Sequence, residues 1–176
     1  MTDFEHFEVL DAVSGSDYLT IQSAMALIEP HKLDISQYSI TVTHDEEHAS
    51  VTFLADDDDA GTRKHYIVRQ GSEVEFKAYN KSMPIPNANY IVLATTIRGD
   101  SLLAINVAET VFKKRTTGLD LTEYRIEVIR ERDSLVVTFV DKDSQSDSFG
   151  GSGGRPGVEV ELSFPELAIR RSNFIR

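Results

Sequence analysis

Two histidines four residues apart are the first feature of this sequence that could do chemistry. His44-Asp-Glu-Glu-His48 matches the H-x-x-E-H pattern of one group of zinc proteases. In those enzymes both histidines lie on one face of a helix and bind the metal together. Here the segment separates two predicted strands and is expected to form a hairpin turn. We therefore expect no metal at this position and interpret the segment as a solvated turn.

A run of four aspartates is the second such feature. Asp56–Asp59 is followed by Ala60 and Gly61, which invites comparison with a calcium-binding loop. An EF-hand loop that begins at Asp56 needs an oxygen ligand at residue 60 and a glutamate at residue 67, but the sequence has Ala60 and Ile67. Its flanks also have the pattern of strands, not helices. A charged hairpin loop is the favoured interpretation, and a loose cation site is the alternative.

A glycine-rich segment, residues 149–157, is the third candidate. A phosphate-binding loop needs a helix after it or a Gly-Lys-Ser/Thr ending, and this segment has neither. It is better interpreted as a flexible connection between strands. The chain has no cysteine and no G-x-S-x-G nucleophile motif, so we expect no catalytic residue and no cofactor.

An internal repeat is the strongest signal in the sequence. Leu33-Asp-Ile-Ser-Gln-Tyr38 aligns with Leu119-Asp-Leu-Thr-Glu-Tyr124 at an offset of 86, and nine of the 25 positions from residue 33 to 57 are identical. At the same offset, five of the eight positions from residue 69 to 76 match residues 155–162. This alignment pairs Arg69 with Arg155, and either arginine could bind a carboxylate. Residues 58–68 match nothing and are expected to form a loop.

Each repeat is predicted to begin with a helix. In the first, Tyr18, Ile21, Met25 and Ile28 follow helical spacing, and Pro30 ends the run. In the second, the predicted apolar stripe consists of six residues and is followed by a basic last turn and Gly118. Those six residues are Leu103, Ala104, Val107, Ala108, Val111 and Phe112.

Strands are predicted to follow each helix. Apolar residues alternate with polar ones from Tyr38 to Val42 and from Tyr124 to Val128, and each run leads through a short turn into Val-Thr-Phe. A third strand is predicted around Val74 and around Val160, with glutamates pointing away from the core. The segments 90–97 and 168–175 could each add a strand.

The predicted fold class is therefore α+β, with two tandem repeats that each pack one helix on an antiparallel meander sheet. The first repeat spans residues 1–88 and the second spans residues 89–176, with residues 79–89 as the linker. One helix on three or four strands leaves a small core, so the two repeats are expected to pack together.

This order of elements resembles cystatin-like bacterial proteins of unknown function and the related nuclear-transport-factor-type folds, which include small bacterial immunity proteins. The resemblance covers about residues 16–77 and 101–170 and rests on a helix, Leu-Asp-x-x-x-Tyr, Val-Thr-Phe and Glu-Val-Glu. Immunity-type relatives often carry Gly-Gly before the third strand; the second repeat has Gly153-Gly154, but the first has Lys64-His65. The resemblance implies a fold and carries no functional residue with it.

Charge indicates the kind of partner. The net charge is −11, and residues 1–88 hold 6 Lys/Arg against 16 Asp/Glu, whereas residues 89–176 hold 12 against 13. Acidic proteins repel phosphate groups, so we expect neither nucleic acid nor an anionic membrane as a partner. No signal peptide or membrane-spanning run is present in this sequence, and a cytoplasmic location is expected.

Our leading hypothesis is a non-catalytic protein-binding module, immunity or inhibitor-like, that is a monomer or homodimer and meets a basic protein. The expected partner-binding residues are Asp45, Glu46, Glu47, Asp56, Asp57, Asp58, Asp59, Glu73, Glu75, Arg69 and Arg155. The alternative is a small-molecule-binding protein or enzyme with a pocket between helix and curved sheet. A third possibility is an assembly protein that pairs through strand edges.

Overall fold

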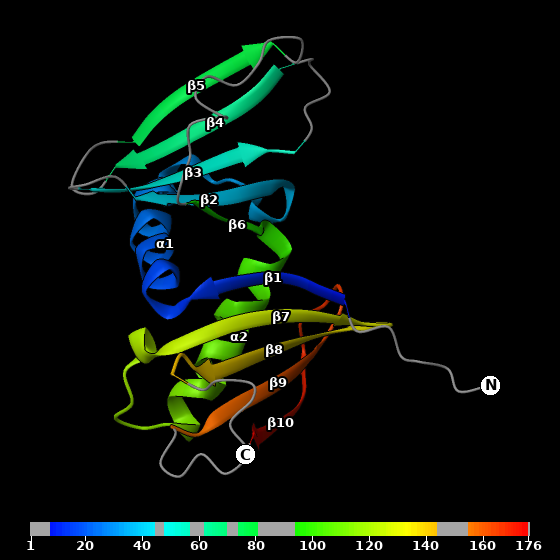
Figure 1. Cartoon of the computed structure of the whole chain (residues 1–176). Helices are drawn as coiled ribbons and strands as arrows, with labels where there is room; N and C mark the ends of the chain where they lie inside the picture. The colour runs from blue at the N-terminus through cyan, green and yellow to red at the C-terminus, as the bar shows by residue number, and fades with distance from the viewer. Residues whose placement is uncertain are drawn as a thin grey trace. The chain divides into compact units, whose positions relative to one another are not determined.

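The computed structural model describes residues 8–44, 48–56, 62–69, 74–80, 94–143 and 155–175. Within them are two α-helices, α1 (Gly15–Ile28) and α2 (Gly99–Arg115), and ten strands in two five-stranded antiparallel sheets (Figure 1). The strands are β1 (Glu8–Ser14), β2 (Tyr38–His44), β3 (Ala49–Ala55), β4 (Thr62–Arg69), β5 (Val74–Asn80), β6 (Ala94–Arg98), β7 (Tyr124–Glu131), β8 (Ser134–Asp141), β9 (Gly157–Ser163) and β10 (Ile169–Ile175). The predicted α+β class with two tandem repeats is confirmed. No helix in the described part of the chain is long and apolar enough to cross a membrane.

The described chain forms two compact units. Unit 1 comprises residues 1–16 and 101–176, and unit 2 comprises residues 17–100. Each unit holds one helix and one sheet: the strand order is β1-β7-β8-β9-β10 in unit 1 and β5-β4-β3-β2-β6 in unit 2. The predicted boundary between residues 88 and 89 separates the two sequence repeats and stays a prediction. The compact units have other boundaries, after residue 16 and after residue 100.

The difference arises because the repeats exchange their first strands. β1 precedes α1 in the first repeat but pairs with β7 of the second, with Val13 opposite Ile126. β6 precedes α2 in the second repeat but pairs with β2 of the first, with Ile97 opposite Ile40. Each sheet is therefore completed by a strand from the other repeat.

Glycine is required where each of these strands enters its helix. A Cβ atom at Gly15 would lie 1.8 Å from the carbonyl oxygen of Leu121, and one at Gly99 would lie 1.6 Å from that of Ile35. Both carbonyls belong to short 3-10 helices, Ile35–Gln37 and Leu121–Glu123, that precede β2 and β7. The backbone can make these close approaches only because no side chain is present.

Burial of the helices follows one pattern in both repeats. Four buried positions recur on the two helices at an offset of 84: Tyr18, Ile21, Ala24 and Ile28 on α1, and Leu102, Ile105, Ala108 and Phe112 on α2. The predicted stripe of α2 is confirmed at Ala104, Ala108 and Phe112, which are buried. Its other three residues, Leu103, Val107 and Val111, are only half-buried, whereas Leu102 and Ile105 lie in the core. In unit 1, the Phe112 ring packs on Tyr124 and Phe139, at centroid distances of 4.9 and 4.6 Å.

The first two strands of each sheet confirm the predicted hairpins. Val42 lies opposite Val51, and Val128 lies opposite Val137, which preserves the offset of 86. All four side chains are buried. Alternation therefore predicted the faces of these strands correctly.

The alignment of the third predicted strand was wrong. Residues 62–68, which were expected to belong to a loop, lie in strand β4, and Val51 pairs with Val68 as Val137 pairs with Val160. β4 is thus the counterpart of β9 at an offset of 92. β5 is the counterpart of β10, because Tyr66 lies opposite Phe76 as Val158 lies opposite Phe174. The repeated Glu-Val-Glu sequence falls on strands that are not equivalent.

Candidate functional site

A pocket lies between α1 and the sheet of unit 2, and we call it the α1 pocket. It has a volume of about 160 Å³ and is open to solvent. Its lining residues are Thr20, Ser23, Ala24, Leu27, Ala49, Val51, Val68 and Arg69. The floor is apolar, because Val51, Val68 and Ala24 belong to the buried core.

The polar groups of the α1 pocket are few. Ser23 donates its hydroxyl hydrogen to the carbonyl oxygen of Leu19, 3.2 Å away, which satisfies that group within the helix. The pocket therefore lacks the converging acid, base and nucleophile that a catalytic centre needs. Its composition suits an apolar group.

Arg69 and Glu75 are the two predicted partner-binding residues nearest the α1 pocket. Arg69 ends β4, and its side chain is 62% exposed and lies 3.7 Å from the Glu75 carboxylate. Glu75 also accepts from Lys77 Nζ at 2.9 Å, and this hydrogen bond lowers the pKa of its carboxyl group. Both predicted residues are exposed, and each has a partner within its own unit.

The predicted acidic residues do not all lie at one end of the sheet. β2 ends at His44, which lies opposite Ala49 at the start of β3, and Arg69 at the end of β4 lies opposite the next residue, Ser50. Asp56 follows β3 at the other end, where it accepts from the Ser39 hydroxyl at 2.8 Å. The remaining predicted residues, Asp45, Glu46, Glu47, Asp57, Asp58, Asp59 and Glu73, lie outside the described residues.

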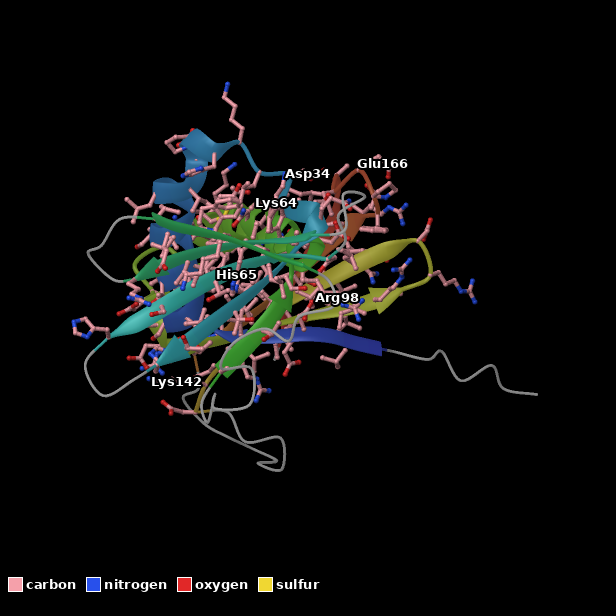
Figure 2. All side chains as sticks on the ribbon, turned by 90° about the horizontal axis from the view of Figure 1, so that it is seen from above. Asp34, Lys64, His65, Arg98, Lys142 and Glu166 are labelled. Carbon is pink, nitrogen blue, oxygen red and sulfur yellow. The ribbon has the colours of Figure 1, made fainter. Side chains whose placement is uncertain are left out.

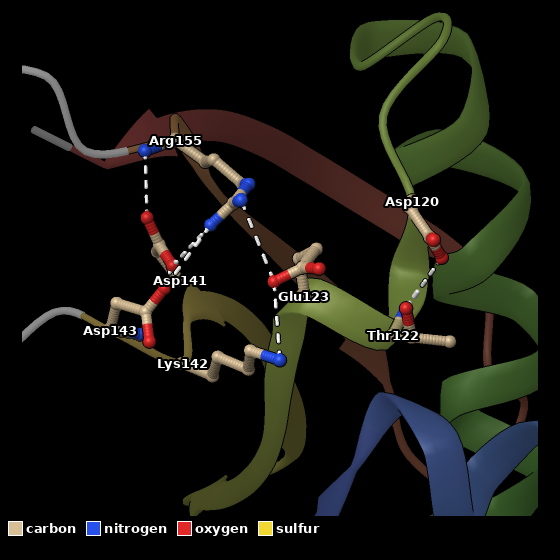
Figure 3. Close-up of polar contacts among 7 residues, drawn as sticks. All are labelled: Asp120, Thr122, Glu123, Asp141, Lys142, Asp143 and Arg155. Carbon is tan, nitrogen blue, oxygen red and sulfur yellow. Dashed lines mark hydrogen bonds and ion pairs between the residues drawn. The ribbon is translucent and has the colours of Figure 1, made fainter.

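Arg155 lies at the centre of a polar cluster in unit 1 (Figure 3). Its guanidinium lies 3.2 Å from Asp141, 3.5 Å from Asp143 and 3.5 Å from Glu123. Lys142 Nζ lies 3.2 Å from the same Glu123 carboxylate. Arg155 does bind carboxylates, but these are carboxylates of its own unit.

Asp141 ties this cluster to the backbone. It ends β8 and accepts from the backbone N–H groups of Arg155, at 2.8 Å, and of Asp143, at 3.1 Å. These two hydrogen bonds hold the pKa of Asp141 below its ordinary value, and the Arg155 charge adds to the effect. The cluster fastens the end of β8 to the start of β9, which is a structural role.

The predicted equivalence of Arg155 with Arg69 is wrong, because residue 155 precedes β9 whereas Arg69 ends β4.

His44, the first histidine of the H-x-x-E-H segment, does not lie on a helix, and residues 45–47 lie outside the described residues. His44 is the last residue of a strand, and its Nε2 lies 2.7 Å from an Asp17 carboxylate oxygen at the start of α1. In the part of the chain that the structure describes, no group of three or more His, Cys, Asp or Glu side chains could hold a metal ion.

His65 is a titratable side chain that the sequence did not single out. It lies on β4 beside Lys64, and strand alternation sends the two side chains to opposite faces of the sheet (Figure 2). Lys64 is exposed, whereas His65 is only 8% exposed. Burial lowers the pKa of His65, and the nearby Lys77 charge lowers it further. The sequence analysis interpreted this strand as part of a loop because residues 58–68 have no match at the offset of 86.

Comparison with known proteins places the chain in no family. No family model matches it, and no curated protein matches it. One solved structure is distantly similar: a candidate lipoprotein from Clostridium difficile 630, which aligns over 96% of this chain and 95% of that chain with 12% identity and a TM-score of 0.28. Similarity at this level carries no information about function. The resemblance to cystatin-like and immunity-type proteins stays an expectation.

Proposed function

We propose that this protein is a non-catalytic binding module whose partner is a basic protein, in the manner of an immunity or inhibitor protein. The observation that carries the proposal is the α1 pocket, a small apolar site at the end of the sheet where β2 and β4 end. Central apolar pockets surrounded by charged residues are typical of protein interfaces.

The charge of the sequence supports a basic partner. In the chain, Asp45-Glu46-Glu47 follows directly on β2, and Glu73 directly precedes β5. The sequence thus carries acidic residues next to two strands that lie at the pocket end of the sheet. Acidic groups at the rim of an interface accelerate association with a basic surface.

The pocket volume favours a protein partner over a free ligand. Small-molecule sites usually enclose about 300–1,000 Å³, and the α1 pocket has about 160 Å³. The α1 pocket does lie between helix and sheet, where the small-molecule alternative expects a site, but it is smaller than such sites usually are, and the alternative stays a prediction. A cytoplasmic location is part of the proposal. The partner would then be a basic cytoplasmic protein.

Charge reversal at the two ends of the sheet tests the proposal. We would capture binding proteins on the immobilised chain, purify each candidate, and titrate it by calorimetry at 50 mM and 300 mM salt. The triple variant Asp45→Lys, Glu46→Lys, Glu47→Lys is expected to weaken binding about ten-fold or more, as is high salt. The matched variant Asp57→Lys, Asp58→Lys, Asp59→Lys has the same charge change in the segment that follows β3. A partner whose affinity ignores both salt and the first variant would contradict the proposal.

A further inference from the structure

The two repeats provide an internal comparison for the α1 pocket. Three of its walls are the same residue type in both repeats: Ala24 corresponds to Ala108 on the helices, Val51 to Val137 and Val68 to Val160 on the strands. Ala108, Val137 and Val160 are each completely buried in unit 1. Ala24, Val51 and Val68 are nearly as buried, at 2–4% exposure, so the repeats must differ in the residues around this shared floor, which in unit 2 lines the α1 pocket.

One such residue in unit 1 is Leu135. This residue lies opposite Arg130 on β7, two positions before Val137, and is 1% exposed. At the same place in the first repeat, opposite His44 and two positions before Val51, stands Ala49. Ala49 is only half-buried and lines the α1 pocket. The replacement of leucine by alanine removes three carbon atoms at the site of the pocket.

The differences between the two helices do not restore this volume. Ser23 is smaller than its counterpart Val107. Thr20 and Leu27 are larger than their counterparts Ala104 and Val111, but Leu27 is 48% exposed and so does not fill the space over the floor. The apolar floor of the α1 pocket is open to solvent, and an apolar side chain that covered it would remove this surface from water.

We infer that the α1 pocket receives a branched aliphatic side chain of leucine size from the partner protein, in the place that Leu135 takes within unit 1. The inference rests on the proposed function, because it specifies how the basic partner is anchored. The partner segment would present leucine between basic residues: the leucine enters the pocket, and the basic residues face the acidic part of the sequence. Burial of one leucine side chain corresponds to about a ten-fold to hundred-fold gain in affinity.

Two peptides test the inference on the full chain. Acetyl-Lys-Lys-Leu-Lys-Lys-amide and acetyl-Lys-Lys-Ala-Lys-Lys-amide have the same charge and differ in one side chain. We expect the leucine peptide to bind at least ten-fold more tightly than the alanine peptide in calorimetry. We also expect the leucine peptide, and not the alanine peptide, to shift the methyl NMR signals of Ala24, Val51 and Val68.

Filling the pocket from within provides the decisive variant. In Ala49→Leu, the protein's own side chain should occupy the site, so the leucine peptide should bind no more tightly than the alanine peptide. Ala49→Val is a smaller change that serves if the leucine variant fails to fold. Ala26→Leu makes the same substitution at an exposed position of α1 outside the pocket and should leave the preference for leucine intact.

The outcomes separate the inference from the proposed function. If both peptides bind equally, or if Ala49→Leu and Ala49→Val retain the full preference, the inference is wrong, although a charge-dependent partner would remain. If neither peptide binds at low salt and charge reversal does not change capture, the proposed function fails as well. A leucine preference that is lost in Ala49→Leu and kept in Ala26→Leu supports the inference.

Discussion

At the scale of single residues, the polar side chains of unit 1 are held by specific partners, and Asp141 is the most buried of the Arg155 cluster at 6% exposure. Its carboxylate accepts from two backbone N–H groups and from Arg155. Asp141→Ala leaves those donors without their acceptor, and we expect a loss of about 1–3 kcal/mol in the free energy of unfolding. Asp143→Ala, at a side chain that is 72% exposed, should change it by less than about 0.5 kcal/mol. Chemical denaturation measures both, and equal effects would refute a structural role for Asp141.

His65 gives the fold a pH dependence of known sign. Burial holds its pKa below the ordinary value of 6.5, so the unfolded chain binds a proton more readily than the folded chain. The stability that this group contributes is complete above pH 6.5 and is lost as pH falls from 6.5 through the folded pKa. Denaturation at pH 7.5 and 5.5 should show a smaller decrease for His65→Gln than for the natural chain. An unchanged decrease would show that His65 does not titrate in this way.

Single residues were also where sequence reasoning was least informative about the site. The acidic residues were chosen for their charge and the two arginines for their place in the repeat alignment, and neither signal reveals that Arg155 is engaged with Asp141 and Glu123. Ala49 went unnoticed because alanine carries no chemistry. A comparison of the two repeats position by position offers a signal, since Leu135 aligns with Ala49 at the predicted offset.

At the scale of elements, the junction between each first strand and its helix depends on glycine. A side chain at Gly15 or Gly99 would collide with a backbone carbonyl that cannot move aside. We expect Gly15→Ala and Gly99→Ala each to cost about 3 kcal/mol or more in unfolding free energy. Gly118 is the matched control: its φ is +86° and no atom lies near its would-be Cβ, so Gly118→Ala should cost only about 1–2 kcal/mol from backbone strain. Thermal unfolding of the three variants measures these costs. If the close approaches are not present in solution, Gly118→Ala would be the most destabilising of the three.

Elements were predictable where periodicity was undisturbed. β2, β3, β7 and β8 alternate cleanly, and their register agreed with the offset of 86. β4 was missed because residues 58–68 match nothing at the offset of 86, and the Glu-Val-Glu similarity aligned β5 instead of β4 with β9. A short strand of mixed composition shows little alternation, so its pattern is weaker evidence than a run of identical residues such as Glu-Val-Glu.

At the scale of the whole molecule, the exchange of strands could not be read from the sequence. β1 and β6 hold the same place in their repeats, so either could complete either sheet on the basis of pattern alone. The choice depends on long-range packing, which one sequence does not encode in any local signal. The exchange means that each sheet draws on both halves of the sequence, although the repeats themselves are consecutive.

This exchange is the claim on which the equivalence of the two repeats depends, and methyl NOE spectroscopy of the full chain tests it most directly. The structure places Val13 opposite Ile126 and Ile97 opposite Ile40. We expect cross-peaks between the methyl groups of Val13 and Ile126, and of Ile97 and Ile40. Cross-peaks between Val13 and Ile40, and between Ile97 and Ile126, would show instead that each repeat closes on its own first strand, and would contradict the account.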